Sequence, residues 1–145
     1  AQREDILREA RRMALEALNT NQTFRCPREI ADYLTAFFAG ETREKFVVVL
    51  LDCHNRLIRT EALFSGSVDV CPVYPREVAR FALEHHARSV IISHNHPSGC
   101  TEPSNADKAM TRKVQQALEL LDIRLLDHII VGGTDHLSMA SRGLL

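Results

Sequence analysis

The sequence predicts an α/β (α+β) protein in which a mixed β-sheet is flanked by helices. Short β-branched and apolar runs alternate with segments of helical periodicity, and hairpin signals lie at both ends of the series of strands. The chain has 145 residues, 45% of them hydrophobic, which is enough to build one core without disulfides or a metal. We therefore expect strands inside and helices outside.

The first part of the chain predicts two helices. Residues 3–18 carry apolar side chains at intervals of three and four with charged residues between them, which is typical of an amphipathic helix. After a polar turn, Pro27 suits the first turn of a second helix, and Gly40 can end it. We assign residues 1–39 to an N-terminal helical segment.

Residues 40–145 are predicted to form the main domain. The run KFVVVLLD, residues 45–52, is typical of a strand covered on both faces, and a turn leads from it into a second strand at 57–64. The elements expected after these two are a helix at 74–87, a strand at 89–94, a helix at 105–121, a strand at 124–133 and a short strand at 136–140.

Net charge, the length of the apolar runs and the cysteine spacing bear on the partners and the compartment of the protein. The net charge is -1, from 18 basic and 19 acidic residues, and gives no general attraction to nucleic acid. The longest apolar runs are far shorter than the roughly 18 to 20 residues of a membrane span, and no signal-peptide pattern opens the sequence. We expect a cytoplasmic protein without a membrane partner. The four cysteines form no CxxC pair, so reduced thiols are expected.

The stretch SHNHPSGCTEPSNAD, residues 93–107, concentrates groups that bind metals. His94 and His96 lie two residues apart where a strand is expected to end, so their side chains project to the same side. Prolines stiffen the loop that follows, and this loop can bring Asp107 to the same point. Two imidazoles and one carboxylate form a three-ligand zinc set, and the position left for water is typical of hydrolysis.

Ser104 and Asp107 also have a second interpretation. Ser-x-x-Asp before an amphipathic helix is typical of a capping box, with Ser104 at the N-cap and Asp107 at the N3 position. Taken alone, these two residues favour the cap. The histidine pair then favours a metal site that includes Asp107.

The residues of this stretch match a known motif. His94, His96, Pro97, Ser104 and Asp107 reproduce the JAMM (MPN+) metalloprotease motif. The segments HNHPSG, YPREV, NRLI and LLDHIIVGG resemble the bacterial RadC-like proteins over roughly residues 40–145. The resemblance implies a fold similar to cytidine deaminases, Zn²⁺ held by the two histidines and Asp107, and Ser104 near the substrate oxyanion.

The resemblance also implies a catalytic glutamate at the start of an early strand, where it takes a proton from water and returns it to the leaving amine. Glu44 occupies such a position and shares strand parity with Phe46. Glu61 and Glu77 are weaker candidates. The alternative for Glu44 is a solvated carboxylate at a strand end.

Two further residues are interpreted as structural. His128 lies in an apolar strand, where it could support a metal ligand, although a histidine there is more often structural. Cys100 lies inside the motif loop, and nothing in the pattern requires it as a fourth ligand.

These observations favour a zinc-dependent hydrolase of the JAMM type that cleaves a peptide or isopeptide bond in a peptide or protein substrate. The alternative is a RadC-like accessory module associated with DNA repair or nucleic-acid binding. The net charge does not support DNA as a partner, and residues 1–39 lack the glycine-bearing turns of the helix-hairpin-helix segment in longer RadC-like proteins. An interaction platform without activity is disfavoured by the complete ligand set. A zinc deaminase would need HxE and PCxxC motifs, which are absent from the sequence.

Overall fold

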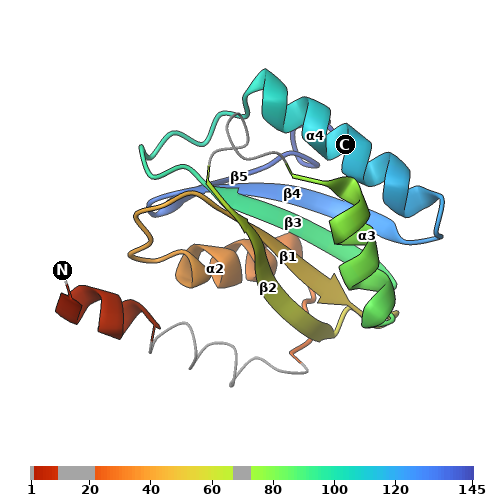
Figure 1. Cartoon of the computed structure of the whole chain (residues 1–145), viewed down its shortest axis with the longest axis horizontal. Helices are drawn as coiled ribbons and strands as arrows, with labels where there is room; N and C mark the ends of the chain where they lie inside the picture. The colour runs from red at the N-terminus through yellow and green to blue at the C-terminus, as the bar shows by residue number, and fades with distance from the viewer. Residues whose placement is uncertain (1, 10–21, 67–72) are drawn as a thin grey trace.

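A five-stranded mixed sheet forms the centre of the molecule (Figure 1). The computed structural model describes residues 2–9, 22–66 and 73–145. The strand order is β2-β1-β3-β4-β5; β3 and β4 are parallel, and the other neighbours are antiparallel. The strands are β1 (Lys45–Leu51), β2 (Leu57–Ser65), β3 (Ser89–Asn95), β4 (Arg124–Gly132) and β5 (Asp135–Ser138). The predicted mixed sheet is confirmed.

Helices cover both faces of this sheet. They are α2 (Pro27–Phe37), α3 (Pro75–Glu84) and α4 (Asn105–Glu119). Both α2 and α3 begin with proline, whose fixed φ suits the first helical turn. Residues 2–9 are also helical, and the rest of the helix expected at 3–18 lies outside the described residues. Within the described ranges, no helix combines the length and apolar character needed to cross a bilayer.

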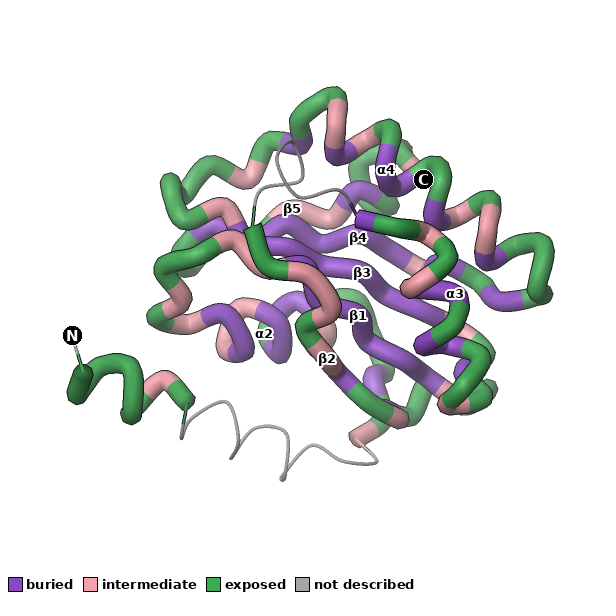
Figure 2. Tube along the Cα trace, in the orientation of Figure 1, coloured by how far each residue is buried: buried purple, intermediate pink, exposed green. Residues whose placement is uncertain are grey.

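The inner strand β1 is buried on both faces because its side chains alternate between two core layers. Phe46 and Val48 pack in the layer beneath α3 and α4, whereas Val47 and Val49 pack in the layer with α2. In Figure 2 the inner strands are buried along most of their length. The prediction of a strand covered on both faces is confirmed.

Helix α2 contributes to the same core as the strands. Leu34 on α2 is fully buried and packs in the layer that contains Val47 and Val49 of β1. The division into residues 1–39 and 40–145 stays a prediction, and α2 precedes that division while covering one face of the sheet.

One end of the sheet brings several chain segments together. His94 near the end of β3 pairs with Phe46 at the start of β1 and with Ile130 on β4. A loop leaves β3 at this end, and α4 begins where the loop ends. Because α4 is the crossover between the parallel strands β3 and β4, its first turn lies beside the last residues of β3.

Candidate metal centre

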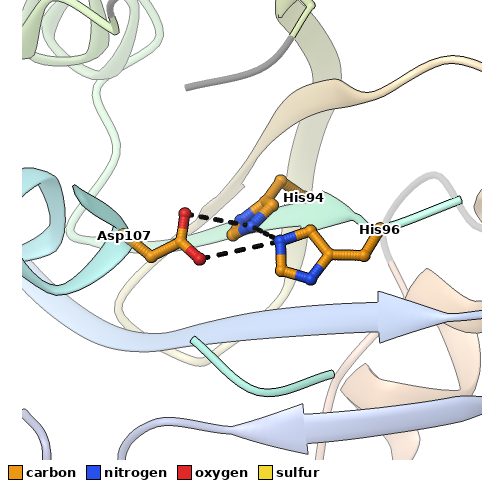
Figure 3. A group of neighbouring side chains, drawn as sticks. All are labelled: His94, His96 and Asp107. Carbon is orange, nitrogen blue, oxygen red and sulfur yellow. Dashed lines mark hydrogen bonds and ion pairs between the residues drawn. The ribbon is translucent and has the colours of Figure 1, made fainter. Parts of the chain in front are cut away.

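The side chains of His94, His96 and Asp107 converge at this end of the sheet (Figure 3). The Nε2 atoms of the two histidines are 2.8 Å apart. Oδ1 of Asp107 lies 3.3 Å from Nε2 of His94, and Oδ2 lies 3.6 Å from Nε2 of His96. Ligands about 2.1 Å from a tetrahedral ion lie about 3.4 Å from one another. The three side chains therefore have the spacing of a metal site, as the sequence predicted.

His96 is the most solvent-accessible of the three residues, and a hydrogen bond to the motif loop orients its ring. Its side chain is 17% exposed, compared with 3% for His94 and for Asp107. Nδ1 of His96 lies 2.7 Å from the carbonyl oxygen of Cys100. A carbonyl only accepts hydrogen bonds, so Nδ1 of the neutral ring carries the proton. Nε2 is then left with a lone pair that faces the cluster.

Hydrogen bonds within the cluster shift two pKa values in opposite directions. Burial alone would raise the pKa of Asp107, but His94 and His96, whose Nε2 atoms donate to the carboxylate when the rings are protonated, outweigh burial and hold the pKa well below its usual range. The hydrogen bond to Asp107 raises the pKa of His96 against the effect of burial. Without a metal, the carboxylate is therefore charged and attracts a proton or another cation.

The predicted capping box is also formed, and it uses the same carboxylate. The Ser104 Oγ accepts a hydrogen bond from the Asp107 backbone N–H at 3.0 Å, and Oδ2 of Asp107 accepts from the Ser104 N–H at 2.8 Å. The two interpretations of Asp107 are therefore compatible, because the cap aims its carboxylate at the histidines. Ser104 is exposed, and its own hydroxyl proton is not used in the cap.

Glu44 lies near His96, at the end of the sheet that carries the cluster. The antiparallel β1–β3 ladder ends with Phe46 paired to His94, and the same register continued by two residues would bring Glu44 opposite His96. Glu44 is half-buried, and its negative charge adds to the raised pKa of His96. The backbone carbonyl of Glu44 accepts from the N–H of Gly66 at 2.8 Å, which extends the β1–β2 pairing to this position.

A buried amide holds the backbone on both sides of Glu44. Oδ1 of Asn95 accepts from the Lys45 N–H at 2.7 Å, and Nδ2 donates to the Arg43 carbonyl at 2.9 Å. Asn95 is only 4% exposed. No local sequence pattern indicates this role of Asn95, since it depends on the pairing of two strands that are far apart in the chain.

The other two glutamates have arginine partners away from the cluster. Glu61 on β2 pairs with Val48 in the sheet, and its carboxylate lies 3.4 Å from Arg59. Glu77 on α3 lies 2.7 Å from Arg80. Of these three glutamates, Glu44 is the one whose charge acts on His96.

His128 contacts a metal ligand directly. Its Nε2 lies 2.7 Å from Nδ1 of His94, and its ring is fully buried. Burial lowers the pKa of His128 well below its usual value, and the charge of His94 acts in the same direction. The sequence pattern favoured a structural role, but strand parity with the ligand-bearing face was a signal that could have identified this contact.

The motif loop lies against the end of β4, where only glycine leaves room for it. A Cβ built on Gly132 would lie 2.5 Å from the carbonyl oxygen of Gly99. The backbone N–H of His96 also donates to the Val131 carbonyl at 2.8 Å. The loop carbonyl that orients His96 is therefore held in place by β4.

A surface pocket of about 550 Å³ adjoins the metal ligands on the α2 side of the sheet. It includes His96 and Pro97 from the motif and extends between α2 and the β4–β5 turn. Its remaining lining includes Asp32, Thr35, Phe38, Glu41, Val131 and Thr134.

Comparison with known proteins agrees with this arrangement. The family model described as RadC-like JAB domain matches residues 24–144. A UPF0758 protein of Pseudoalteromonas translucida is 49% identical over 140 residues, which are 97% of this chain and 62% of that protein. UPF0758 proteins of Idiomarina loihiensis and Acidovorax sp. are 45% and 46% identical over 140 residues, covering 62% and 59% of their lengths.

The chain spans about three-fifths of the length of these relatives. The mixed sheet with its flanking helices is consistent with the JAMM/MPN fold that the motif implied. The resemblance found in the sequence is confirmed, and this chain belongs to the family of RadC-like JAB domains.

Proposed function

We propose that this chain is a zinc-dependent hydrolase of the JAMM type that cleaves a peptide or isopeptide bond. The observation that carries the proposal is the convergence of two imidazole nitrogens and a carboxylate within 3.6 Å of one another. The ring of His96 is held with its Nε2 lone pair toward this point by the Cys100 carbonyl. Electron pairs placed this close repel one another unless a cation lies between them.

The donor set fits zinc. Two neutral imidazoles and one carboxylate offer nitrogen and oxygen atoms of the kind that zinc binds, and three protein ligands are typical of catalytic rather than structural sites. A bound Zn²⁺ would act as a Lewis acid and would lower the pKa of a water in the remaining position to about 7.

The protein's own residues would then move the protons. Glu44 takes one proton as water adds to the carbonyl carbon, and it returns that proton to the nitrogen when the C–N bond breaks. The β1–β3 register, continued two residues beyond the Phe46–His94 pair, would bring Glu44 opposite His96 and supports this role. The exposed hydroxyl of Ser104 donates a hydrogen bond to the oxygen that becomes negative. The pocket beside His96 offers room for the chain of a peptide or protein substrate.

Metal content and peptide hydrolysis, measured on the same preparations, test this proposal. In His96→Ala and Asp107→Ala, bound zinc and turnover should both be lost. In Glu44→Gln, zinc should stay bound while turnover falls by about 10²- to 10⁴-fold, since only the proton carrier is removed. Fluorogenic peptides and lysine-linked isopeptides serve as substrates, with a chelator control.

Glu61→Gln and Glu77→Gln are the matched controls, because both carboxylates pair with arginines outside the cluster. They should keep turnover within about twofold of the unmodified protein. Equal zinc in the unmodified protein and in His96→Ala would contradict the proposed site. Full turnover in Glu44→Gln would assign the proton transfer to another group.

The nucleic-acid alternative makes a different prediction. If the chain neutralised several phosphates, its affinity for DNA would fall steeply as salt increases. The net charge of -1 supplies no general attraction of this kind. DNA affinity with a steep salt slope, together with absent hydrolysis, would favour the accessory role.

A further inference from the structure

His128 belongs to a continuous chain of hydrogen bonds that begins at one metal ligand and ends at another. Nδ1 of His94 lies 2.7 Å from Nε2 of His128. Nδ1 of His128 lies 2.5 Å from Oγ1 of Thr111, and Oγ1 donates to the backbone carbonyl of Asp107 at 2.6 Å. His128 is 0% exposed and Thr111 is 1% exposed. Strands β3 and β4 and helix α4 each contribute to the chain.

The Asp107 carbonyl fixes the direction of every bond in this chain. A carbonyl only accepts, so the Thr111 hydroxyl donates to Asp107 at 2.6 Å, in preference to the weak sulfur acceptor of Met139 at 3.8 Å. The Thr111 oxygen must then accept the Nδ1 proton of His128. A neutral imidazole with its proton on Nδ1 has a lone pair on Nε2, which accepts from Nδ1 of His94. The proton of His94 is therefore on Nδ1, and Nε2 faces the cluster with its lone pair.

We propose that His128 and Thr111 are positioning residues for the metal site, which fix the tautomer and ring orientation of His94 and couple it to the helical turn that carries Asp107. This inference rests on the metal site of the proposed function. It explains how His94, whose neighbours in the sheet are apolar, presents the same nitrogen as His96, which uses the Cys100 carbonyl for the same purpose.

The alternative is that His128 fills space in the core. Its ring meets Phe46 edge-on with centroids 6.3 Å apart, as an aromatic core residue would. A phenylalanine at position 128 would keep this packing and remove both ring nitrogens. A glutamine offers its amide oxygen at about the place of Nε2, so it keeps an acceptor for His94.

Metal affinity separates the two roles. The binding of Zn²⁺ and Co²⁺ is measured by competition titration on folded His128→Phe, His128→Gln, Thr111→Val and Thr111→Ser. We expect His128→Phe to bind about 10- to 100-fold more weakly, with His128→Gln closer to the unmodified protein. Thr111→Val should also bind more weakly, and Thr111→Ser should restore the affinity because it keeps the hydroxyl.

Thr60→Val is the matched control for a buried threonine. Thr60 is 9% exposed, and its hydroxyl accepts a hydrogen bond from Tyr33 at 2.9 Å, in the part of the sheet next to α2. It should lose stability without losing metal affinity. If His128→Phe does not fold, nitrogen-15 NMR of the metal-loaded, unmodified protein provides the second measurement. The proton should then be found on Nδ1 of both His94 and His128.

Metal affinity in His128→Phe within twofold of the unmodified protein would overturn the inference, as would a proton on Nε2 of His94 in the metal-loaded protein. Zinc bound normally without hydrolysis of any peptide would contradict the proposed reaction but not the positioning role. If Thr60→Val lost as much metal affinity as Thr111→Val, the loss would be due to general destabilisation of the fold. This result would overturn the inference.

Discussion

Individual residues at the metal centre serve two purposes at once. Asp107 caps α4 through its contact with the Ser104 N–H while its carboxylate faces both histidines. Nδ1 of His96 forms a hydrogen bond with the Cys100 carbonyl of the loop, and Nε2 faces His94 and Asp107. Substitution of either residue therefore changes local structure and ligand geometry together, and the pH dependence of stability is a more selective probe.

The metal-free protein should be less stable on both sides of about pH 6.5, the ordinary pKa of histidine. The folded-state pKa of His128 is lowered by burial, so its contribution is present above that pH and is lost below it, where the unfolded chain binds a proton. The pKa of His96 is raised by Asp107, so its contribution is present below about 6.5 and is lost as pH rises through the folded-state value.

Urea unfolding between pH 5 and 8 with a chelator present measures this dependence. Below about pH 6.5, protonation of His128 in the unfolded chain should lower the free energy of unfolding by up to about 1.4 kcal/mol per pH unit. The variant His128→Gln removes the titrating ring. It should remove the pH dependence of the free energy of unfolding below about pH 6.5 and keep the dependence above it. An equal slope below about pH 6.5 in both proteins would show that other groups cause it.

At the scale of elements, the motif loop and β4 form one packed unit. The loop backbone at Gly99 lies so close to Gly132 that the absence of a side chain there is a steric requirement. The same contact keeps the Cys100 carbonyl next to His96. The end of β4 therefore supports the loop that orients His96.

Gly132→Ala should weaken metal binding and lower stability by about 1 to 3 kcal/mol, because the new Cβ meets backbone atoms rather than a movable side chain. Gly133→Ala is the control. Gly133 has a φ of 63° and open space around it, so alanine there should cost about 1 to 2 kcal/mol of backbone strain and leave metal affinity unchanged. Equal metal affinity in Gly132→Ala and Gly133→Ala would contradict the expected effect of the loop contact on metal binding.

For the whole molecule, the core is built without the metal ligands. The two layers on either side of β1 consist of apolar side chains from strands and helices, and the ligands lie at the end of the sheet. The fold should therefore persist when the metal is removed, and metal binding should add stability to it.

Thermal unfolding with and without a chelator checks this expectation. Zinc at 100 times its dissociation constant should add about 2.7 kcal/mol and raise the Tm. The Tm of His96→Ala should not respond to zinc. Loss of cooperative unfolding in the chelated protein would show instead that the metal is needed for the fold.

The sequence was sufficient to predict the elements and the grouping of His94, His96 and Asp107, because periodicity and short spacing are local properties. The strands at 45–51 and 89–95 and the cap at Ser104 follow from such patterns. The contacts that orient the ligands are not local. Asn95 beside Glu44 and His128 beside His94 depend on which strands pair and in what register, and this is decided by the packing of the whole sheet.

The parallel pairing of β3 with β4 separates the parts of the site along the chain. The three predicted ligands occur within fourteen residues, but the ring beside His94 comes from β4, which follows the α4 crossover in the chain. A nascent chain that ends before residue 128 carries the ligands with His94 free to offer either nitrogen. If His128 positions His94 as proposed, a chain truncated before residue 128 should bind metal more weakly than the whole chain.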